Sequence, residues 1–210
     1  IILENIKMKY LWLSIFTPIL IWSAYLPKDP FTWFLEVLPV FIGLFILLLT
    51  YSRYPLTPLL YTLILLHMII LMVGGHYTYA EVPLFEWFKE IFNHDRNNYD
   101  KVGHFAQGCI PAIIAREILI RKEIVQGSKI WLNYIVLSII LAFSAFYELL
   151  EWWVALAVGE DAEAFLGTQG YVWDTQSDMG YALLGGVIGL LLLSRIHDKQ
   201  LKQGSWQVLD

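Results

Sequence analysis

Two glutamates stand in the middle of one of the most apolar stretches of the chain. Residues 143–161 read FSAFYELLEWWVALAVGED, and Glu148 and Glu151 are three residues apart, which places them on one face of a helix. A carboxylate buried in apolar surroundings costs several kcal/mol unless it is paired, protonated or bound to a metal ion. These two glutamates therefore predict a compensating partner on another segment.

Two further segments carry polar pairs at helical spacing. Asp100 and His104 are four residues apart in YDKVGHFAQG, and Asp174 and Asp178 are four residues apart in VWDTQSDMG. One imidazole cannot balance five carboxylates, and like charges cannot share a buried site without protons or cations. We therefore expect either protonated acids or a bound divalent metal ion. Mg²⁺, Mn²⁺, Ca²⁺ or Zn²⁺ would suit such ligands, and the excess of carboxylates favours a hard cation or a two-metal site.

The composition indicates that these groups lie in a membrane protein. Of the 210 residues 58% are hydrophobic and 16% are charged, and the mean hydropathy is +0.57. Soluble domains carry about 25% charged residues. The net charge of −5 and the lack of a basic stripe argue against nucleic acid as a partner. The single cysteine, Cys109, excludes an internal disulfide, and nothing in the sequence indicates an oligomeric state.

Six apolar segments reach the length of about 20 residues that a membrane-spanning helix needs. They lie near residues 10–26, 31–51, 56–75, 99–119, 129–157 and 177–195. The predicted fold class is therefore all-α: a polytopic membrane protein with six transmembrane helices in one domain over residues 8–203. The short end segments, 1–7 and 204–210, could be remnants of added tags or linkers.

The distribution of basic residues predicts the orientation. With six spans, ten lysines and arginines flank the bundle on one side, and four lie on the other side among many acidic residues. The positive-inside rule then places both termini in the cytoplasm. Glu148 lies roughly 28 Å along the fifth span, and the fourth and sixth spans start at the outer surface. The three polar pairs are therefore expected at one depth on the extracytoplasmic side.

Two connections have their own predictions. Residues 82–92 read VPLFEWFKEIF, a mixture of apolar and charged residues that suits a helix lying in the outer interface, or equally a lid packed on the bundle. The connection 159–176 is rich in glycine, acidic and aromatic residues and is expected to dip back into the protein.

These positions predict a metal-dependent membrane enzyme, a hydrolase or transferase that acts on a lipid or lipid-linked substrate. Glu151 or Asp100 would act as general base or orient the imidazole. The aromatic side chains of Trp152, Trp153, Tyr171 and Trp173 would cover the acyl chain or head group. The expected metal ligands are His104, Glu148, Asp174 and Asp178.

Other interpretations of the same residues remain open. The two glutamates could be protonated or hydrogen-bonded carboxyls that hold helices together, and the two aspartates of the sixth span could be N-terminal helix caps. A proton- or cation-coupled transporter would use the same carboxylates, with Glu36 and His67 as its best further support. A structural or regulatory protein with a stabilising Ca²⁺ is a third possibility.

Several polar residues and glycines are predicted to lie outside the cluster. Glu36 and His67 are placed near the middle of the bilayer, away from the cluster, as structural residues or part of a proton path. Arg116 and Glu117 are predicted to lie at the cytoplasmic end of the fourth span, in the membrane interface. Helix packing is predicted for the glycines of the last span, Gly180, Gly185, Gly186 and Gly189.

The three motifs also carry a resemblance. YDKVGHFAQG, FYELLEWW and VWDTQSDMG together resemble the YjdF family of bacterial inner-membrane proteins, of unknown function, over nearly all of residues 8–203. The pattern D-K-x-x-H-F, E-x-x-E and D-x-x-x-D is also distantly similar to the VanZ-like family, which is associated with glycopeptide (teicoplanin) resistance. The resemblance implies a polytopic protein of the bacterial inner membrane and emphasises the same polar residues, but it implies no reaction.

Overall fold

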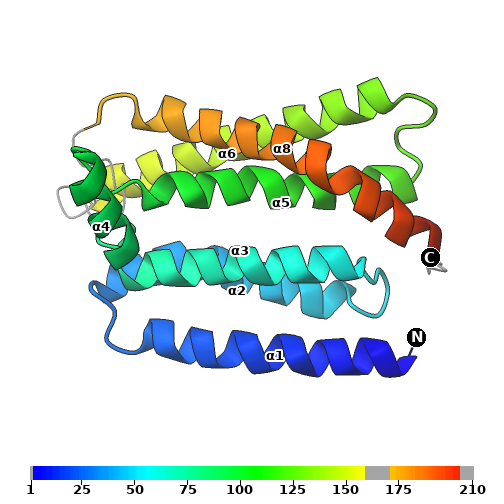
Figure 1. Ribbon diagram of the computed structural model, residues 1–210, viewed down its shortest axis with the longest axis horizontal. Coiled ribbons are helices and arrows are strands. Elements are labelled where there is room, and N and C mark those ends of the chain that lie inside the picture. Colours follow the sequence, from blue (N-terminus) through cyan, green and yellow to red (C-terminus); the bar gives the residue numbers. More distant parts are fainter. Residues whose placement is uncertain (1, 159–170, 204–210) are drawn as a thin grey trace.

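The computed structural model describes residues 2–158 and 171–203, with side chains from residue 9 onward, and this part of the chain is entirely helical (Figure 1). The predicted all-α class is confirmed, and most of the expected connection at 159–176 lies outside the described residues. The predicted spans correspond closely to six of the helices, although α1 begins earlier than expected. The helices within the described ranges are α1 (Ile2–Ala24), α2 (Pro30–Thr50), α3 (Pro58–His76), α4 (Pro83–Phe92), α5 (Tyr99–Arg121), α6 (Lys129–Val158) and α8 (Asp174–Gln203).

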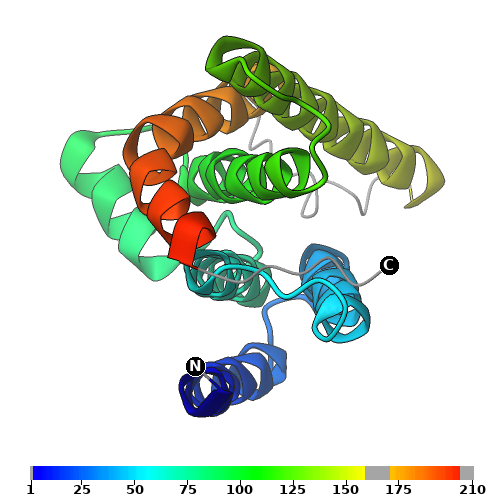
Figure 2. The ribbon, with the colours of Figure 1, turned by 90° about the vertical axis from the view of Figure 1, so that its right-hand side faces the viewer.

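Four of the described helices, α2, α3, α6 and α8, are long and apolar enough to cross a membrane. α5 runs beside them through the bundle but is not among the four, because charged residues from Asp100 to Glu117 lower its hydropathy. Figure 2 looks along the helices and shows α5 near the centre, with α1 at one edge. The chain is therefore an all-α membrane protein in which a long helix with several charged residues lies inside the bundle.

α5 and α8 form the most extensive helix pair, and α5 also packs against α6 and α3. Glycine allows the close approach of the pair: a Cβ on Gly108 would overlap the backbone carbonyl of Ala182, and one on Gly185 would overlap that of Phe105. The predicted packing role is confirmed for Gly185, Gly186 and Gly189. It is wrong for Gly180, where a Cβ would meet only open space.

α4 lies across one end of the bundle, and the long helices run perpendicular to it (Figure 1). No residue of α4 is buried. Its apolar side exposes Leu84, Trp87, Ile91 and Phe92, while Phe85 packs on the ring of Tyr99. Of the two predicted alternatives, a helix in the membrane interface fits this exposed apolar side better than a packed lid.

Asp29 caps the N-terminus of α2 at the same end of the bundle. Its side chain accepts a hydrogen bond from the backbone N–H of Thr32 at 2.6 Å. This backbone hydrogen bond is the main reason why the pKa of Asp29 lies below its ordinary value of 3.8. A carboxyl whose pKa is lower in the folded state stabilises the fold above its unfolded pKa. It loses that contribution as pH falls through the folded pKa.

Replacing Asp29 by alanine is expected to lower the free energy of unfolding at pH 7 by about 1 kcal/mol, the usual contribution of an N-cap. The difference from the wild type should shrink as pH falls below about 4 and the wild-type carboxyl becomes protonated. Thermal unfolding of both proteins in detergent across this pH range measures the difference in stability. Asp29→Asn keeps a capping oxygen and should remain close to the wild type at pH 7. An alanine penalty that does not change with pH would contradict the charge-based explanation.

Candidate functional site

Three helices bring the predicted site residues to the end of the bundle that carries α4. α5 contributes Asp100 and His104, α6 contributes Glu148 and Glu151, and α8 contributes the two aspartates of its first turns. Asp100, Glu148, Asp174 and Asp178 are buried, with 9% or less of each residue exposed. The three segments therefore lie together at one depth, and most of their acidic groups are shielded from solvent.

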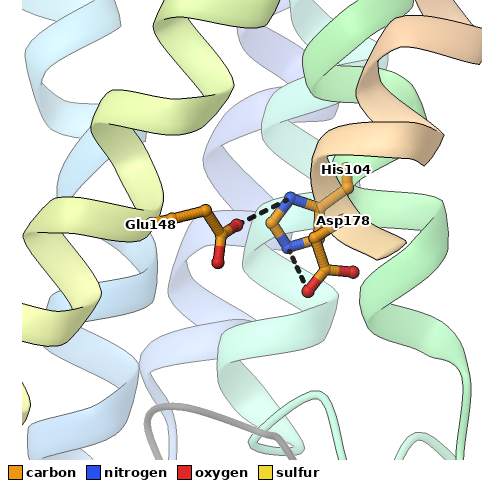
Figure 3. A group of neighbouring side chains, drawn as sticks. All are labelled: His104, Glu148 and Asp178. Atoms are coloured by element: carbon orange, nitrogen blue, oxygen red, sulfur yellow. Dashed lines mark ion pairs between the residues drawn. The ribbon is translucent and has the colours of Figure 1, made fainter. Parts of the chain in front are cut away.

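His104 lies between Glu148 and Asp178 (Figure 3). Its Nδ1 is 3.9 Å from Oε1 of Glu148, and its Nε2 is 3.6 Å from Oδ2 of Asp178. Nδ1 also lies 2.9 Å from the amide oxygen of Gln107, one turn further along α5. Because an amide oxygen can only accept a hydrogen bond, Nδ1 carries the proton in a neutral ring. The lone pair of Nε2 is then available to a metal ion.

Glu148 has a buried oxygen without a hydrogen bond. Thr175 donates a hydrogen bond to its carboxyl group. Within residues 2–158 and 171–203, however, Oε1 has no hydrogen-bond partner. Leaving a buried polar atom unpaired costs about 1–3 kcal/mol, and such atoms in native proteins often mark a missing water or ion. The unpaired oxygen of Glu148 lies on the side of its carboxyl that faces His104.

Two buried basic side chains lie inside the acidic cluster. Arg96 donates hydrogen bonds to Asp100 and Asp174. Nζ of Lys101 lies 2.7 Å from Oδ1 of Asp178, 2.9 Å from Oδ1 of Asp174 and 3.3 Å from Oδ2 of Asp100. The expectation that only protons or a metal ion could balance the carboxylates is therefore wrong, because two of the negative charges are neutralised by the protein itself.

This network divides the predicted site residues into two groups. Asp100 and Asp174 accept hydrogen bonds from the basic side chains, whereas His104 and Glu148 lie on the other side of Asp178. Asp178 belongs to both groups, since Oδ1 accepts from Lys101 and Oδ2 faces the imidazole. Asp174 and Asp178 thus bind side chains of α5. Their predicted alternative role as N-terminal helix caps did not include these contacts.

Glu36 is a further acidic residue near the site. It is buried on α2, with 7% exposed, and lies within electrostatic range of Asp100 and Glu151. The hydroxyl groups of Tyr79 and Tyr147 lie within the same range. The prediction that Glu36 lies away from the cluster is wrong, because it is within two turns of the start of α2, at the end of the bundle that carries the cluster.

His76 takes no part in the cluster. Its Nδ1 is 3.0 Å from the backbone oxygen of Ser23, and its ring packs on Trp22 with the centroids 4.5 Å apart. These contacts join the end of α3 to the end of α1. His76 therefore has a structural role at this end of the bundle.

A second buried polar network lies at the opposite end of the bundle, where the sequence predicted residues of the membrane interface. Glu117 is fully buried and accepts hydrogen bonds from Thr57 (2.8 Å), Arg121 (2.7 Å) and Nε2 of His197 (2.9 Å). Nη1 of Arg116 lies 2.8 Å from Nδ1 of the same imidazole. Arg116 and Glu117 are therefore buried between helices at this end of the bundle: they connect α5 to the start of α3 and to α8.

A polar cavity of about 400 Å³ opens beside the acidic cluster. Its wall includes Arg96, Lys101, Tyr171, Ser177 and Tyr181. The ring of Tyr171 lies over both basic groups, with its centroid 5.5 Å from the guanidinium carbon and 5.6 Å from the ammonium nitrogen. The cluster is therefore next to a space that a polar head group could enter.

The fold and these side chains define a helical membrane protein with a charged, buried site at one end of its bundle. Residues 8–199 match the family described as predicted membrane protein DUF2238, and the chain belongs to this family. It is 54% identical to the inner membrane protein YjdF of Escherichia coli (strain K12) over 187 residues, 89% of each chain. No solved structure matches the chain. The predicted family and the inner-membrane location are confirmed.

Proposed function

We propose that His104, Glu148 and Asp178 bind one divalent metal ion and that the protein is a metal-dependent enzyme acting on a lipid or lipid-linked substrate. The carrying observation is the unpaired buried Oε1 of Glu148, which lies 3.9 Å from Nδ1 of the imidazole whose Nε2 is available as a ligand. One ligand atom from each residue lies within 4.8 Å of the others. Ligands of one ion lie about 3–3.5 Å apart, so small side-chain shifts would suffice.

The charge balance of the cluster supports a divalent ion. The negative charges of Asp100, Asp174 and Asp178 exceed the positive charges of Arg96 and Lys101 by one, and Glu148 adds a second negative charge. A single divalent cation would neutralise both. Asp174, predicted as a fourth ligand, is held by the two basic groups, and we assign it to the network that supports the site. A set of three protein ligands would leave a coordination position for water or substrate.

The chemistry that such an ion supplies is activation of a bound water and polarisation of a phosphoryl or carbonyl oxygen. Glu151 lies one turn closer to the outer surface than Glu148 and within electrostatic range of Asp178. We assign it the role of general base. Asp100, the other predicted base, already accepts from Arg96, which suits a structural role better. The polar cavity beside the cluster would receive the substrate's head group.

The proposal includes six membrane crossings with both termini in the cytoplasm. α1 and α5 run the length of the bundle beside the four apolar helices, and the start of α1 and the end of α8 lie at the same end (Figure 1). Ten basic residues around that end against four at the other end fit the positive-inside rule. In this orientation the acidic cluster opens to the extracytoplasmic leaflet.

Proton- or cation-coupled transport is the second candidate function. Glu36 favours it, because this buried acid extends the cluster from α5, α6 and α8 to α2 without being needed for a three-ligand metal site. Acidic residues inside membrane proteins often form proton or cation pathways. In that case Glu36 and Glu151, with the nearby tyrosines, would carry the coupled ion.

The enzyme proposal predicts a chelator-sensitive change in a lipid. Purified protein would be incubated with a bacterial membrane lipid extract that includes lipid-linked precursors, with Mn²⁺ or with EDTA, and the products followed by mass spectrometry. A product is expected with Mn²⁺ only, and Glu148→Gln and Asp178→Asn should reduce its rate by about 100-fold or more. Glu90→Gln, which neutralises an exposed glutamate of α4, should retain the rate. Metal binding without any EDTA-sensitive product would instead indicate a structural ion.

A further inference from the structure

The ammonium group of Lys101 occupies a position suited to a metal ion. Its three nearest acidic groups come from two helices, α5 and α8, and each offers an oxygen at 2.7 to 3.3 Å. Oxygen atoms of the same three residues, Asp100, Asp174 and Asp178, also lie within 4.8 Å of one another. Hard divalent cations bind oxygen ligands at about 2.1–2.5 Å, so the carboxylates would need to move only slightly to bind an ion instead.

The surroundings of Lys101 hold the ammonium in place. The residue is 7% exposed, the ring of Tyr171 lies over its nitrogen, and Arg96 bridges the aspartates of α5 and α8. Lys101 also fixes Asp178, because Oδ1 accepts from the ammonium while Oδ2 is directed at His104. The lysine is therefore next to the three-ligand site and shares one carboxylate with it.

We propose that Lys101 is a built-in counter-ion that fills a second cation position and limits the site to one metal ion. It acts as a positioning residue, because it holds one oxygen of Asp178 and leaves the other for the metal. This inference rests on the proposed metal site for its functional meaning, but its geometry is independent of Glu148. It also decides between the one-metal and two-metal alternatives that the excess of carboxylates suggested.

Removal of the ammonium should convert the three aspartates into a second metal site. In Lys101→Met the carboxylates would face one another with only Arg96 as a counter-charge, and like charges at this distance favour binding of a cation. Lys101→Arg retains the positive charge and serves as the matched control. Lys101→Gln provides a second neutral variant with a polar end.

The test is the number of Mn²⁺ ions bound per protein, measured by EPR titration of detergent-purified protein. The wild type and Lys101→Arg are expected to bind one ion, and Lys101→Met and Lys101→Gln two. A double variant that carries both Lys101→Met and Glu148→Gln should still bind one ion, held by the three aspartates of the second position. Mn²⁺ should also raise the melting temperature of Lys101→Met more than that of the wild type, since the metal replaces the lost charge.

The outcomes for the two proposals can be told apart. A metal-free wild type together with one Mn²⁺ in Lys101→Met would reject the proposed three-ligand site and retain the role of Lys101. Folded neutral variants that bind no more Mn²⁺ than the wild type would overturn the inference. Failure to recover either neutral variant folded from cells grown with added Mn²⁺ would also count against it, because the ion is expected to take the place of the ammonium.

Discussion

Replacement of Glu117 by alanine is expected to destabilise the protein by about 3–5 kcal/mol, the usual cost of breaking a buried ion pair from one side. The change would leave Arg121 without its carboxylate and would remove the acceptor of Thr57 and His197. Reversible denaturation in mixed detergent micelles measures the free energy. Glu90→Ala, which removes an exposed carboxylate, should change it little. A loss below about 1 kcal/mol for Glu117→Ala would contradict the expected cost of breaking this buried network.

The network around Glu117 also affects the site at the other end of the bundle. α8 is one continuous helix from Asp174 to Gln203, so contacts at His197 restrict its rotation about its own axis. That rotation determines whether Asp178 points toward Lys101 and His104. The stabilisation around Glu117 therefore supports the geometry of the site at the other end of the bundle.

Replacement of Glu148 by glutamine is expected to lower the affinity for Mn²⁺ by about 100-fold or more, because it removes an anionic ligand from the site. The shape of the side chain is retained, and so is an oxygen that can accept from Thr175. The fold should therefore be preserved. Isothermal titration of wild-type and variant protein measures the affinity, and circular dichroism checks the helix content.

Glu90→Gln provides the control for this change, since it removes one negative charge of the same type from an exposed position on α4. Its affinity for Mn²⁺ should equal that of the wild type. Equal affinity in Glu148→Gln would exclude Glu148 as a ligand and favour the interpretation of this carboxyl as a helix-packing group.

Most of the fold could be predicted because its signals are local. The lengths of the apolar segments marked the long helices, and proline stands at the first position of α2, α3 and α4, where its fixed backbone angle suits a helix start. The early start of α1 was not predicted because Glu4, Asn5, Lys7 and Lys9 interrupt the apolar residues of its first turns. The charged residues of α5 make it less apolar than a typical span, and only packing inside the bundle explains its position.

The site could be predicted only in part, because spacing along one helix does not determine how the helix is rotated against its neighbours. Counting residues placed the three polar pairs at one depth. It did not show that Arg96 and Lys101 point inward, although a lysine within a span already requires an acidic partner. Glu36 could have been placed near the site by its distance from the start of α2. The contact between Glu117 and His197 joins positions far apart in sequence, and no local pattern predicts it.

The most direct test of the proposed metal site is pulsed EPR of protein loaded with one equivalent of Mn²⁺. The proposed site predicts nitrogen hyperfine coupling from a single imidazole, which disappears in His104→Gln and persists in Glu90→Gln. Bound Mn²⁺ without nitrogen coupling, or a folded wild type that binds no Mn²⁺, would contradict a site formed by His104, Glu148 and Asp178.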